Sequence, residues 1–489
     1  MAILADRESQ LLIDGKLVAG SSGTFRTVNP ATEETLGVSA DASVEDMSAA
    51  IAAARQAFDE TDWSRNVELR VRCVRQLQQA MRDHVEELRE LAILEVGAPR
   101  MLTSMAQLEG PIEDLSFSAD TAESYQWTTD LGVATPMGIK THRKIAREAI
   151  GVVGAISPWN FPNQINLAKL GPALAAGNTV VLKPAPDTPW SAAVLGQLIL
   201  EHTDTPAGVV NIVTSSDRGV GALLSKDPRV DMVSFTGSTN TGRVVMTDCS
   251  ETLKKVFLEL GGKSAFLVLD DADLPTACSM SAFTASLHAG QGCAITTRLV
   301  VPRARYDEAV EAAAATMTGL KPGDPNDAGT ICGPVISERQ RDRILGYLDL
   351  AIAEGGRFAC GGGRPADRNT GFFIEPTVIA GLDNNARVAR EEIFGPVLTV
   401  IAHDGDDDAV RISNDSPYGL SGTVFSSDQE RAAGIAARMR VGTVNVNGGV
   451  WYSADMPFGG YKQSGIGREM GLAGFEEYLE TKAIATAAN

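Results

Sequence analysis

Short apolar runs alternate with amphipathic stretches over most of the chain beyond residue 148. Six runs rich in β-branched residues are each followed by a turn or a helical pattern: GVVGAIS (151–157), NTVVLKP (178–184), VVNIV (209–213), DMVSFTG (231–237), KKVFLEL (254–260) and SAFLVL (264–269). Apolar strands that alternate with helices are typical of a parallel sheet covered on both sides. The pattern predicts a doubly wound α/β fold for this part of the chain.

A second series of the same kind follows residue 296. It consists of TRLVV (297–301), GFFIEPTVI (371–379), PVLTVIA (396–402), SGTVFS (421–426) and GTVNVN (442–447). Two α/β domains are therefore expected, since 489 residues exceed the size of one ordinary domain. Residue 293 falls near the junction of the two series, and ligand clefts often lie between domains.

The first 125 residues carry helical patterns, and we expect helices before any strand. Ser43 and Ser64 stand at N-cap positions of two amphipathic runs, the second of which ends near Gly97 and Pro99. The polar stretch 126–149 interrupts the first domain. With the C-terminal FEEYLETKAIAT (475–486) it is expected to form strands that pair outside either core.

Composition and charge narrow the classes of function. The chain holds 62 acidic and 43 basic residues, a net charge of −19, whereas nucleic acids and anionic membranes need clustered Lys and Arg. MAILADRESQ reaches charged residues too early for a signal peptide, and AIGVVGAIS (149–157) is too short to cross a bilayer. Six scattered cysteines form no C-x-x-C pair. We therefore expect no disulfide framework, no metal site and a cytoplasmic location.

One cysteine stands out by its surroundings. GQGCAITTR (290–298) places Cys293 between a glycine and small residues, near the middle of the chain. Buried free cysteines are common, so this stretch alone does not separate a nucleophile or a ligand from a small buried hydrophobe.

Two strand ends are candidates for binding phosphate or a sugar. FTGSTNTGR (235–243) places Gly237 and Ser238 after a strand and before a helix, and a helix N-terminus can hold a phosphate through free N–H groups. The stretch is neither G-x-G-x-x-G nor a P-loop, and taken alone it is better explained as an ordinary glycine-rich turn between a strand and a helix. Lys183 ends an apolar strand, where it faces either a crevice or solvent.

Three further polar residues lie in apolar or rigid surroundings. Glu259 lies inside an apolar strand, where a carboxylate is costly to bury unless it is paired or used. Glu392 leads into an apolar turn, and Asn160 is fixed between two prolines. Strand-end capping, turn chemistry and a loop hydrogen bond would explain them separately. Together with Cys293 they contain the parts of one mechanism.

These residues lie in motifs of a known family. The chain resembles the NAD(P)-dependent aldehyde dehydrogenase superfamily, of the non-acylating, hydrolytic type. The resemblance runs in the family's order through PWNFP, LGPALAAGNTVVLKPA, FTGST, LELGGKS, GQGC, EEIFGPV and PFGGYKQSGIGRE, and it covers essentially the whole chain.

The resemblance implies a role for each candidate. Cys293 is the nucleophile that attacks the aldehyde carbonyl, and Asn160 with the Cys293 backbone N–H forms the oxyanion hole. After hydride transfer to the nicotinamide, Glu259 activates the water that hydrolyses the thioester. The cofactor is NAD, with NADP as a second acceptor, and its binding residues by resemblance are Trp159, Lys183, Gly221, Gly237, Ser238, Glu392 and Phe394.

The resemblance also implies an architecture. It divides the chain into a Rossmann-like cofactor-binding domain (1–125 and 150–260), a catalytic domain (261–468) and a small β ribbon for oligomerisation (126–149 and 469–489). Homodimers or homotetramers are the norm of the family.

Two departures from the family pattern concern the adenosine end of the cofactor site. NAD-preferring relatives usually carry Glu three residues after the strand-end lysine, whereas this chain has Pro186, followed by Asp187. We expect Asp187 to be an exposed loop carboxylate. In NIVTSSDRGVG (211–221), Ser215 replaces an expected glycine.

Three alternative functions stay open. A CoA-acylating relative would not need the base, which Glu259 argues against. A cysteine hydrolase or transferase needs an activating histidine, and His288 would point about 140° away from Cys293 on one helix. A non-catalytic protein would have no reason to carry Asn160, Glu259, Cys293 and Glu392 together.

The substrate is not defined by these motifs. By resemblance the pocket positions are aromatic and apolar: Phe161, Ala168, Trp451, Tyr452 and Phe458. Ala168 stands where relatives have an aromatic residue, and no Arg is placed to hold a carboxylate. A medium-sized apolar or aromatic aldehyde is expected.

Overall fold

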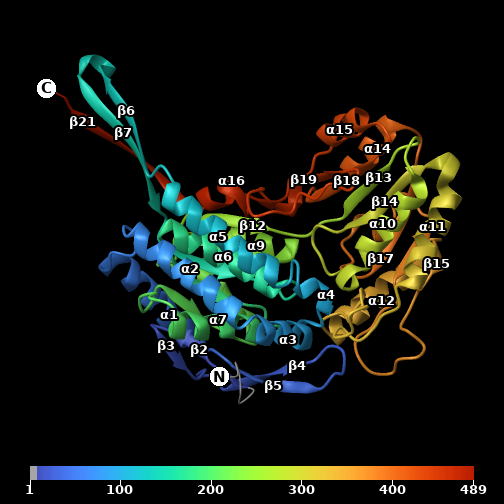
Figure 1. Ribbon diagram of the computed structural model, residues 1–489, viewed down its shortest axis with the longest axis horizontal. Coiled ribbons are helices and arrows are strands. Elements are labelled where there is room, and N and C mark those ends of the chain that lie inside the picture. Colours follow the sequence, from blue (N-terminus) through green and yellow to red (C-terminus); the bar gives the residue numbers. More distant parts are fainter. Residues whose placement is uncertain (1–7, 489) are drawn as a thin grey trace.

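The structure is a computed structural model that describes residues 8–488. The first seven residues, on which part of the signal-peptide expectation rests, lie outside the described residues. Two α/β lobes lie side by side, and a narrow ribbon projects from one of them (Figure 1).

The first lobe is built on an eight-stranded sheet of order β20-β12-β11-β8-β9-β10-β2-β3. Its five central strands pair in parallel and coincide with predicted runs: β8 (Val152–Ile156), β9 (Thr179–Lys183), β10 (Val210–Ile212), β11 (Met232–Thr236) and β12 (Lys255–Glu259). Antiparallel strands add to both edges: β2 (Leu11–Ile13), β3 (Lys16–Val18) and β20 (Gly465–Ile466).

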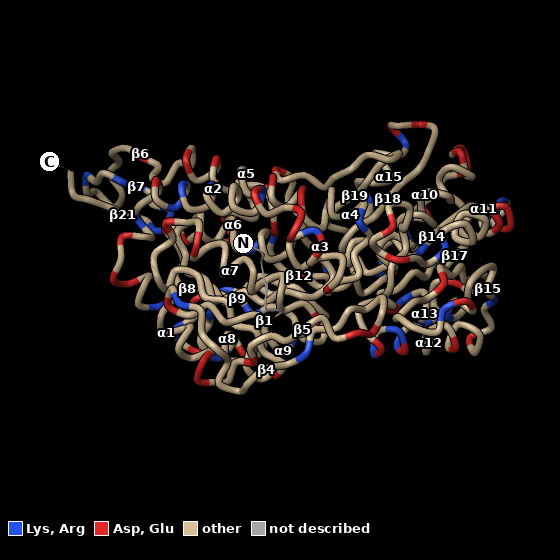
Figure 2. Tube along the Cα trace, turned by 60° about the horizontal axis from the view of Figure 1, so that its bottom comes forward, with Lys and Arg blue, Asp and Glu red and all other residues tan. Residues whose placement is uncertain are grey.

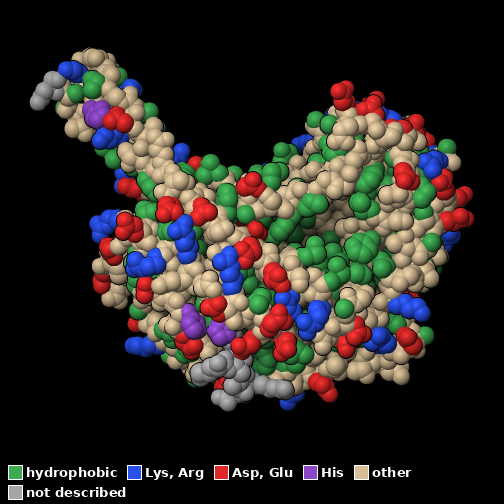
Figure 3. All heavy atoms as spheres, viewed as in Figure 1, with side chains coloured by type: hydrophobic (Ala, Val, Ile, Leu, Met, Phe, Trp, Pro, Cys, Tyr) green, Lys and Arg blue, Asp and Glu red, His purple; other side chains and the backbone are tan. Residues whose placement is uncertain are grey.

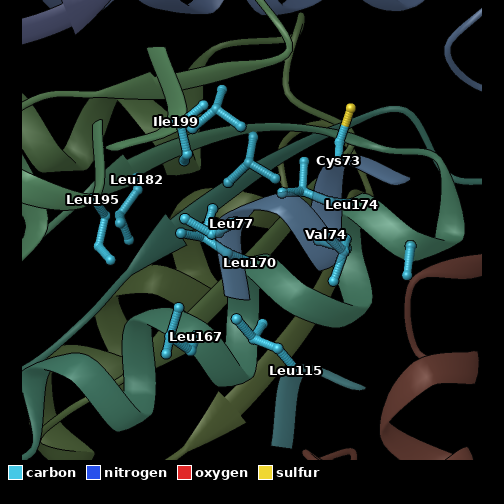
Figure 4. Close-up of a cluster of buried hydrophobic side chains, with 14 of the residues drawn as sticks. Cys73, Val74, Leu77, Leu115, Leu167, Leu170, Leu174, Leu182, Leu195 and Ile199 are labelled. Atoms are coloured by element: carbon cyan, nitrogen blue, oxygen red, sulfur yellow. The ribbon is translucent and has the colours of Figure 1, made fainter. Parts of the chain in front are cut away.

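Helices cover both faces of this sheet. One face packs against α2 (Val67–Asp83), α5 (Glu109–Ser124), α6 (Pro162–Ala176) and α7 (Pro189–His202). Figure 4 shows leucines of these helices in one cluster with Leu182 of β9, which lies beside Leu195. The other face packs against α1 (Val44–Glu60), α8 (Arg218–Lys226) and α9 (Thr239–Cys249). Adjacent residues of β9 serve opposite faces, since Val181 belongs to the second core and Leu182 to the first. Three more helices complete the lobe: α3 (Val85–Val96), α4 (Arg100–Thr103) and α16 (Gly471–Glu476).

The second lobe holds a seven-stranded sheet of order β15-β16-β17-β14-β13-β18-β19. Its strands are β13 (Ser264–Val268), β14 (Thr296–Pro302), β15 (Arg357–Cys360), β16 (Thr377–Ala380), β17 (Val397–His403), β18 (Ser421–Phe425) and β19 (Thr443–Val446). All pairs are parallel except β15 with β16. Its helices are α10 (Leu274–Ser286), α11 (Tyr306–Gly319), α12 (Glu338–Ala353), α13 (Arg387–Arg390), α14 (Asp406–Asn414) and α15 (Gln429–Arg438). The predicted pair of doubly wound α/β sheets is confirmed.

Two small sheets lie outside these cores. The polar stretch 126–149 forms β6 (Thr128–Ala134) and β7 (Thr141–Ala149), and β21 (Leu479–Ala487) adds to β7 over nine residue pairs. The predicted pairing of this stretch with the C-terminus is therefore confirmed. The other sheet joins β1 (Glu8–Ser9), β4 (Thr24–Val28) and β5 (Thr35–Ala40). Four short 3₁₀ turns complete the elements: η1 (Pro136–Gly138), η2 (Leu287–Gly290), η3 (Arg303–Arg305) and η4 (Lys462–Ser464).

The N-terminal expectations need correction. Strands β1–β5 precede the first helix, although they are too short to show a clear alternation in the sequence. Ser43 caps α1 through a capping box with Asp46, as expected, but Ser64 caps nothing. The cap of α2 is Asn66, whose side chain accepts from the Leu69 N–H. The long amphipathic run is two helices, because the chain breaks at His84.

Charged residues of both signs are interspersed over the lobes rather than segregated (Figure 2). Among the helices of residues 8–488, none combines the length and the apolar run that crossing a bilayer requires.

Candidate active site

A cleft of about 200 Å³ opens at the carboxyl ends of the first sheet. After β8 the chain adds β9 and then β10 on one side of β8. It then crosses to the other side of β8 and adds β11 and β12 there, so the strand order reverses between β8 and β11. Ligands of doubly wound sheets bind at such a reversal. The segment after β8 (158–160) and the segment after β11 (237–238) both line the cleft. The face shown in Figure 3 is hollowed between the two lobes.

Eight of the ten predicted site residues line this cleft. They come from both lobes and from five separate motifs: Trp159, Asn160, Gly237, Ser238, Glu259, Cys293, Glu392 and Phe394. Residues up to 235 positions apart in the sequence meet here, because the second lobe packs against the first sheet.

Cys293 lies on the connection between η2 and β14 and is half-buried. The expectation of one helix from His288 to Cys293 is wrong. Helix α10 ends at Ser286, and His288 and Ala289 both have positive φ, 51° and 52°. Gly290 then passes so close to Gly395 that a Cβ there would lie 2.1 Å from the Gly395 carbonyl oxygen. This irregular turn places Cys293 in the cleft.

His288 still does not activate the thiol. Its ring is buried, and burial lowers its pKa to about 4, so the imidazole is neutral. The ring Nε2 lies 2.9 Å from the Asn160 carbonyl oxygen and must carry the proton in that hydrogen bond. No ring nitrogen contact with Cys293 is present among the hydrogen bonds of the described residues.

The Cys293 thiol interacts with the Glu259 carboxyl at the end of β12. Burial and the neighbouring Glu259 raise the pKa of the thiol well above its ordinary value. Burial likewise raises the pKa of Glu259 to about 8, although the thiol hydrogen bond opposes this shift. Two adjacent buried groups cannot both be charged cheaply. Both groups are therefore mostly protonated at neutral pH, and the carboxyl, which has the lower pKa, ionises first.

Asn160 is oriented by two sets of hydrogen bonds. Its Nδ2 donates to the Gln291 carbonyl at 2.9 Å, which leaves its second amide hydrogen free for the cleft. Its own carbonyl accepts from Gln107 Nε2 at 2.8 Å and from His288. Gln107 and Gln291 had no motif in the sequence to mark them.

Glu392 and Phe394 form the opposite wall of the cleft. Glu392 Oε1 accepts from the Gly262 N–H at 2.9 Å, and burial raises the pKa of the carboxyl. A Cβ at Gly261 would lie 2.4 Å from Glu392 Oε2, which explains the first glycine of LELGGKS. Phe394 has a positive φ of 62°, and its ring meets Trp159 edge to face at 5.3 Å.

Helix α12 supplies two cleft residues that the sequence analysis missed. Gln340 Nε2 donates to the Phe394 carbonyl at 2.8 Å, and Arg343 donates to the Glu392 carbonyl at 2.5 Å. Both therefore hold the strained turn that carries Glu392 and Phe394. They belong to the polar face of an ordinary amphipathic helix, so no local pattern could have marked them.

Lys183 and Gly221 lie apart from the cleft but contact each other. Lys183 is buried, and its Nζ donates to the carbonyls of Pro184 and Ser215. Burial lowers the pKa of Lys183 to about 8. A Cβ at Gly221 would lie 2.8 Å from Lys183 Cδ, so glycine leaves room for the lysine stem.

The expectation that Asp187 is exposed is wrong. Its side chain is half-buried in the turn after β9, and burial raises the pKa of the carboxyl. Arg339, Arg218 and Lys183 are the cations that oppose this shift. The compact turn that Pro184 and Pro186 impose faces Asp187 toward these cations rather than toward solvent.

A buried ion pair lies behind Glu259. Lys169 of α6 and Glu469 are 3.1 Å apart, and Lys169 also donates to Ser234 Oγ. The charge of Glu469 raises the pKa of Glu259, and the charge of Lys169 lowers it. This pair was not predicted, because its members lie 300 positions apart and in unrelated motifs.

Comparison with known proteins places this geometry in a family. The profile of the aldehyde dehydrogenase family matches residues 17–484. A 3-succinoylsemialdehyde-pyridine dehydrogenase from a Pseudomonas species is 40% identical over 480 residues, covering 97% of this chain and 98% of that protein.

Solved structures agree in fold over the whole length. A betaine aldehyde dehydrogenase from Staphylococcus aureus, in complex with NAD⁺, matches with a TM-score of 0.96 at 36% identity, covering 100% of this chain and 96% of that one. A cysteine-to-alanine mutant of aldehyde dehydrogenase C from Pseudomonas syringae, with NAD⁺ and octanal, matches at 0.93 and 39% identity, covering 98% and 97%. With its motifs, its fold and nearly all of its length matched, this chain belongs to the aldehyde dehydrogenase family.

Proposed function

We propose that the protein oxidises an aldehyde to its carboxylic acid with NAD through a covalent thioester on Cys293. The observation that carries this proposal is the meeting of a thiol, a carboxyl of raised pKa and an oriented amide in one cleft at the reversal of the first sheet. A CoA-acylating enzyme would need no such carboxyl beside the thiol.

The chemical steps follow from these three groups. The Cys293 thiol loses its proton to solvent and its Sγ bonds to the aldehyde carbon, while the oxygen that becomes negative is stabilised by the free Asn160 amide hydrogen and the Cys293 N–H. Loss of hydride from the adduct leaves a thioester. Glu259 then takes a proton from water, whose oxygen attacks the thioester carbon, and the thiolate leaves as the acid forms.

The cleft fits a nicotinamide dinucleotide. Thr236 Oγ1 and Glu259 Oε1 line it and are buried without a partner among the described residues. Ser238 caps the eleven-residue helix α9, whose N-terminal N–H groups suit a pyrophosphate. When bound, the cofactor supplies the acceptor for the hydride. We assign Glu392 to the nicotinamide-side ribose, Phe394 and Trp159 to the walls, and Lys183 with Gly221 to the adenosine end.

The remaining assignments rest on the same family. We propose a cytoplasmic homodimer or homotetramer that associates through β6, β7 and β21, and the domain limits 1–125 with 150–260, 261–468, and 126–149 with 469–489. NADP serves as a second acceptor. The similar solved structures include a betaine aldehyde dehydrogenase and an aldehyde dehydrogenase mutant in complex with octanal, so the family alone does not select a substrate.

A cysteine replacement tests the proposal. Cys293→Ala should lower NAD-dependent aldehyde oxidation by at least about 10³-fold, because the covalent step is lost. Cofactor binding, measured by fluorescence titration, should persist. Cys360→Ser is the matched control, since Cys360 is also half-buried but lies on β15, away from the cleft. Ordinary turnover by Cys293→Ala would refute the assignment.

A further inference from the structure

A second, smaller cavity of about 40 Å³ lies against α6, further along this helix than the cofactor cleft. It is enclosed by α5, α6, the segment 452–454 and the start of α16, which pack together in the first lobe (Figure 1). Two of the five pocket positions of the sequence analysis, Ala168 and Tyr452, line it. The small side chain of Ala168 leaves this space open.

The cavity carries a carboxylate that the sequence analysis missed. Asp114 of α5 lines it, is half-buried and accepts a hydrogen bond from the Tyr452 hydroxyl. Burial raises the pKa of Asp114 to about 6, so the group is charged at pH 7.5. Among residues 8–488 no Lys, Arg or His forms an ion pair with it. A half-buried charge held only by a neutral hydroxyl lacks most of its compensation.

The neighbouring residue shows the contrast. Glu113 lies on the exposed face of the same helix and forms a two-pronged ion pair with Arg82. Asp114 points instead to the cavity, where the other ionisable side chain in the lining is Tyr452. Phe117, Phe475 and Met470 supply apolar and aromatic walls.

The cavity lies next to the reacting groups. Ile165 lines the catalytic cleft, and Ala168 lies three residues further along α6, about 4.5 Å along the helix axis. Glu469 connects the two sides electrostatically, since it acts on both Glu259 and Tyr452. An aldehyde whose carbonyl lies at Cys293 would reach this cavity by extending its far end past Ile165 toward Ala168.

We propose that this cavity binds a cationic, ammonium-type group at the far end of the aldehyde substrate, with Asp114 as its counter-ion and Tyr452 as the residue that orients Asp114. The proposal rests on the function proposed above and names its substrate class. The carboxylate gains the missing charge partner, and aromatic walls favour a cation over their faces. An aldehyde with a terminal carboxylate is repelled. This proposal replaces the earlier expectation of a medium-sized apolar or aromatic aldehyde.

A matched pair of substrates isolates the charge. 6-(Dimethylamino)hexanal is a tertiary amine that is protonated at pH 7.5 and keeps one N–H to donate, and 7-methyloctanal has the same shape without the charge. The wild-type enzyme should prefer the amine by kcat/KM. Asp114→Asn should lower kcat/KM for the amine at least about tenfold, mainly through KM, and change 7-methyloctanal by less than about twofold. Tyr452→Phe should weaken the same preference by a smaller factor.

Glu113→Gln is the control variant, because it removes the same charge one position away, outside the cavity. It should leave the preference unchanged. The cationic subsite would be overturned if Asp114→Asn lowered kcat/KM equally for both aldehydes, or if Glu113→Gln reduced the preference for the amine as much as Asp114→Asn does. Turnover of 7-methyloctanal would still support the proposed oxidation in either case. Failure of the wild type to oxidise either aldehyde would count against both.

Discussion

At the scale of single residues, the site depends on the protonation of Cys293 and Glu259. The two groups lie in contact and burial raises the pKa of both. The Glu259 carboxyl raises the pKa of the thiol further, whereas the thiol hydrogen bond lowers the pKa of Glu259. A carboxyl whose pKa is about 8 is mostly protonated at pH 7, and once ionised it is a stronger base than an ordinary glutamate. Water activation should therefore depend on pH through Glu259.

Glu259→Gln should separate the two half-reactions. Release of the acid needs a base, whereas hydride transfer from the thiohemiacetal does not. A burst of up to about one reduced cofactor per site should therefore come first, followed by steady turnover that is slowed by at least about 10²-fold. Rapid mixing with absorbance detection measures both phases. Loss of the burst itself would show that Glu259 also deprotonates the thiol, as its contact with Cys293 suggests. Normal steady turnover would reduce Glu259 to a structural residue.

The sign of the pH dependence follows from the raised pKa. The base form of Glu259 increases as pH rises through about 8, so the rate of thioester hydrolysis should climb about tenfold per unit below pH 7 and level off above 9. The Glu259→Gln variant should lose this inflection in single-turnover acid release. An unchanged profile in the variant would assign the inflection to another group.

Site residues were predictable from the sequence where an unusual chemical environment and a family motif fall at the same position. Glu259 was singled out as a carboxylate inside an apolar strand and Asn160 as a residue fixed between two prolines, and the family resemblance then assigned their roles. Gln340, Arg343 and Asp114 were not, because their local patterns are those of amphipathic helices. Their roles arise only when α12 and α5 pack beside the site.

At the scale of elements, parallel strands were predicted well and turns were not. The buried strands are apolar over their whole length, so their pattern survives without knowledge of the fold. The antiparallel edge strand β15 was missed, because its half-exposed residues have no such pattern. The break at His288 was missed because left-handed non-glycine residues are set by close packing with the Gly395 turn.

The turn between β9 and α7 carries the prediction on cofactor choice. Pro186 has no side-chain acceptor for the ribose hydroxyls, and Lys183 tolerates a hydroxyl or a phosphate. We expect NAD to be used with measurable NADP activity. Pro186→Glu should reduce NADP use most, by repelling the 2′-phosphate. Kinetics with both cofactors measure the ratio.

The half-buried Asp187 provides the opposite test. Asp187→Asn removes a negative charge beside Lys183 and Arg218, so it should raise NADP use relative to NAD. If the parent already rejects NADP by more than about 10³-fold, roughly 4 kcal/mol, then Asp187 performs the role of the missing glutamate. In that case Asp187→Asn should change the ratio of NADP to NAD activity more than Pro186→Glu does.

At the scale of the whole molecule, the ribbon of β6, β7 and β21 is the element that the two cores do not explain. It projects from the first lobe, and its order leaves β21 and β6 as unpaired edges (Figure 1). It exposes apolar side chains over its length: Leu131, Val133, Met137, Ile139 and Ile484. A projecting ribbon with open edges and exposed apolar residues is poorly stable alone and suited to a partner subunit. The sequence could predict the strands, but not where they project.

We therefore expect the double variant Leu131→Asp with Val133→Asp to lose association. Charges on an edge strand are costly to bury in an interface, so its mass in solution, measured by light scattering, should fall to one chain of 51.6 kDa. Leu200→Asp, an exposed apolar position on α7 away from the ribbon, should keep the parent's mass. Since every cleft residue comes from one chain, activity per site should survive in the dissociated variant. A dissociated variant without activity would show that the assembly supports the site, and an unchanged oligomer would show that the subunits associate through another surface.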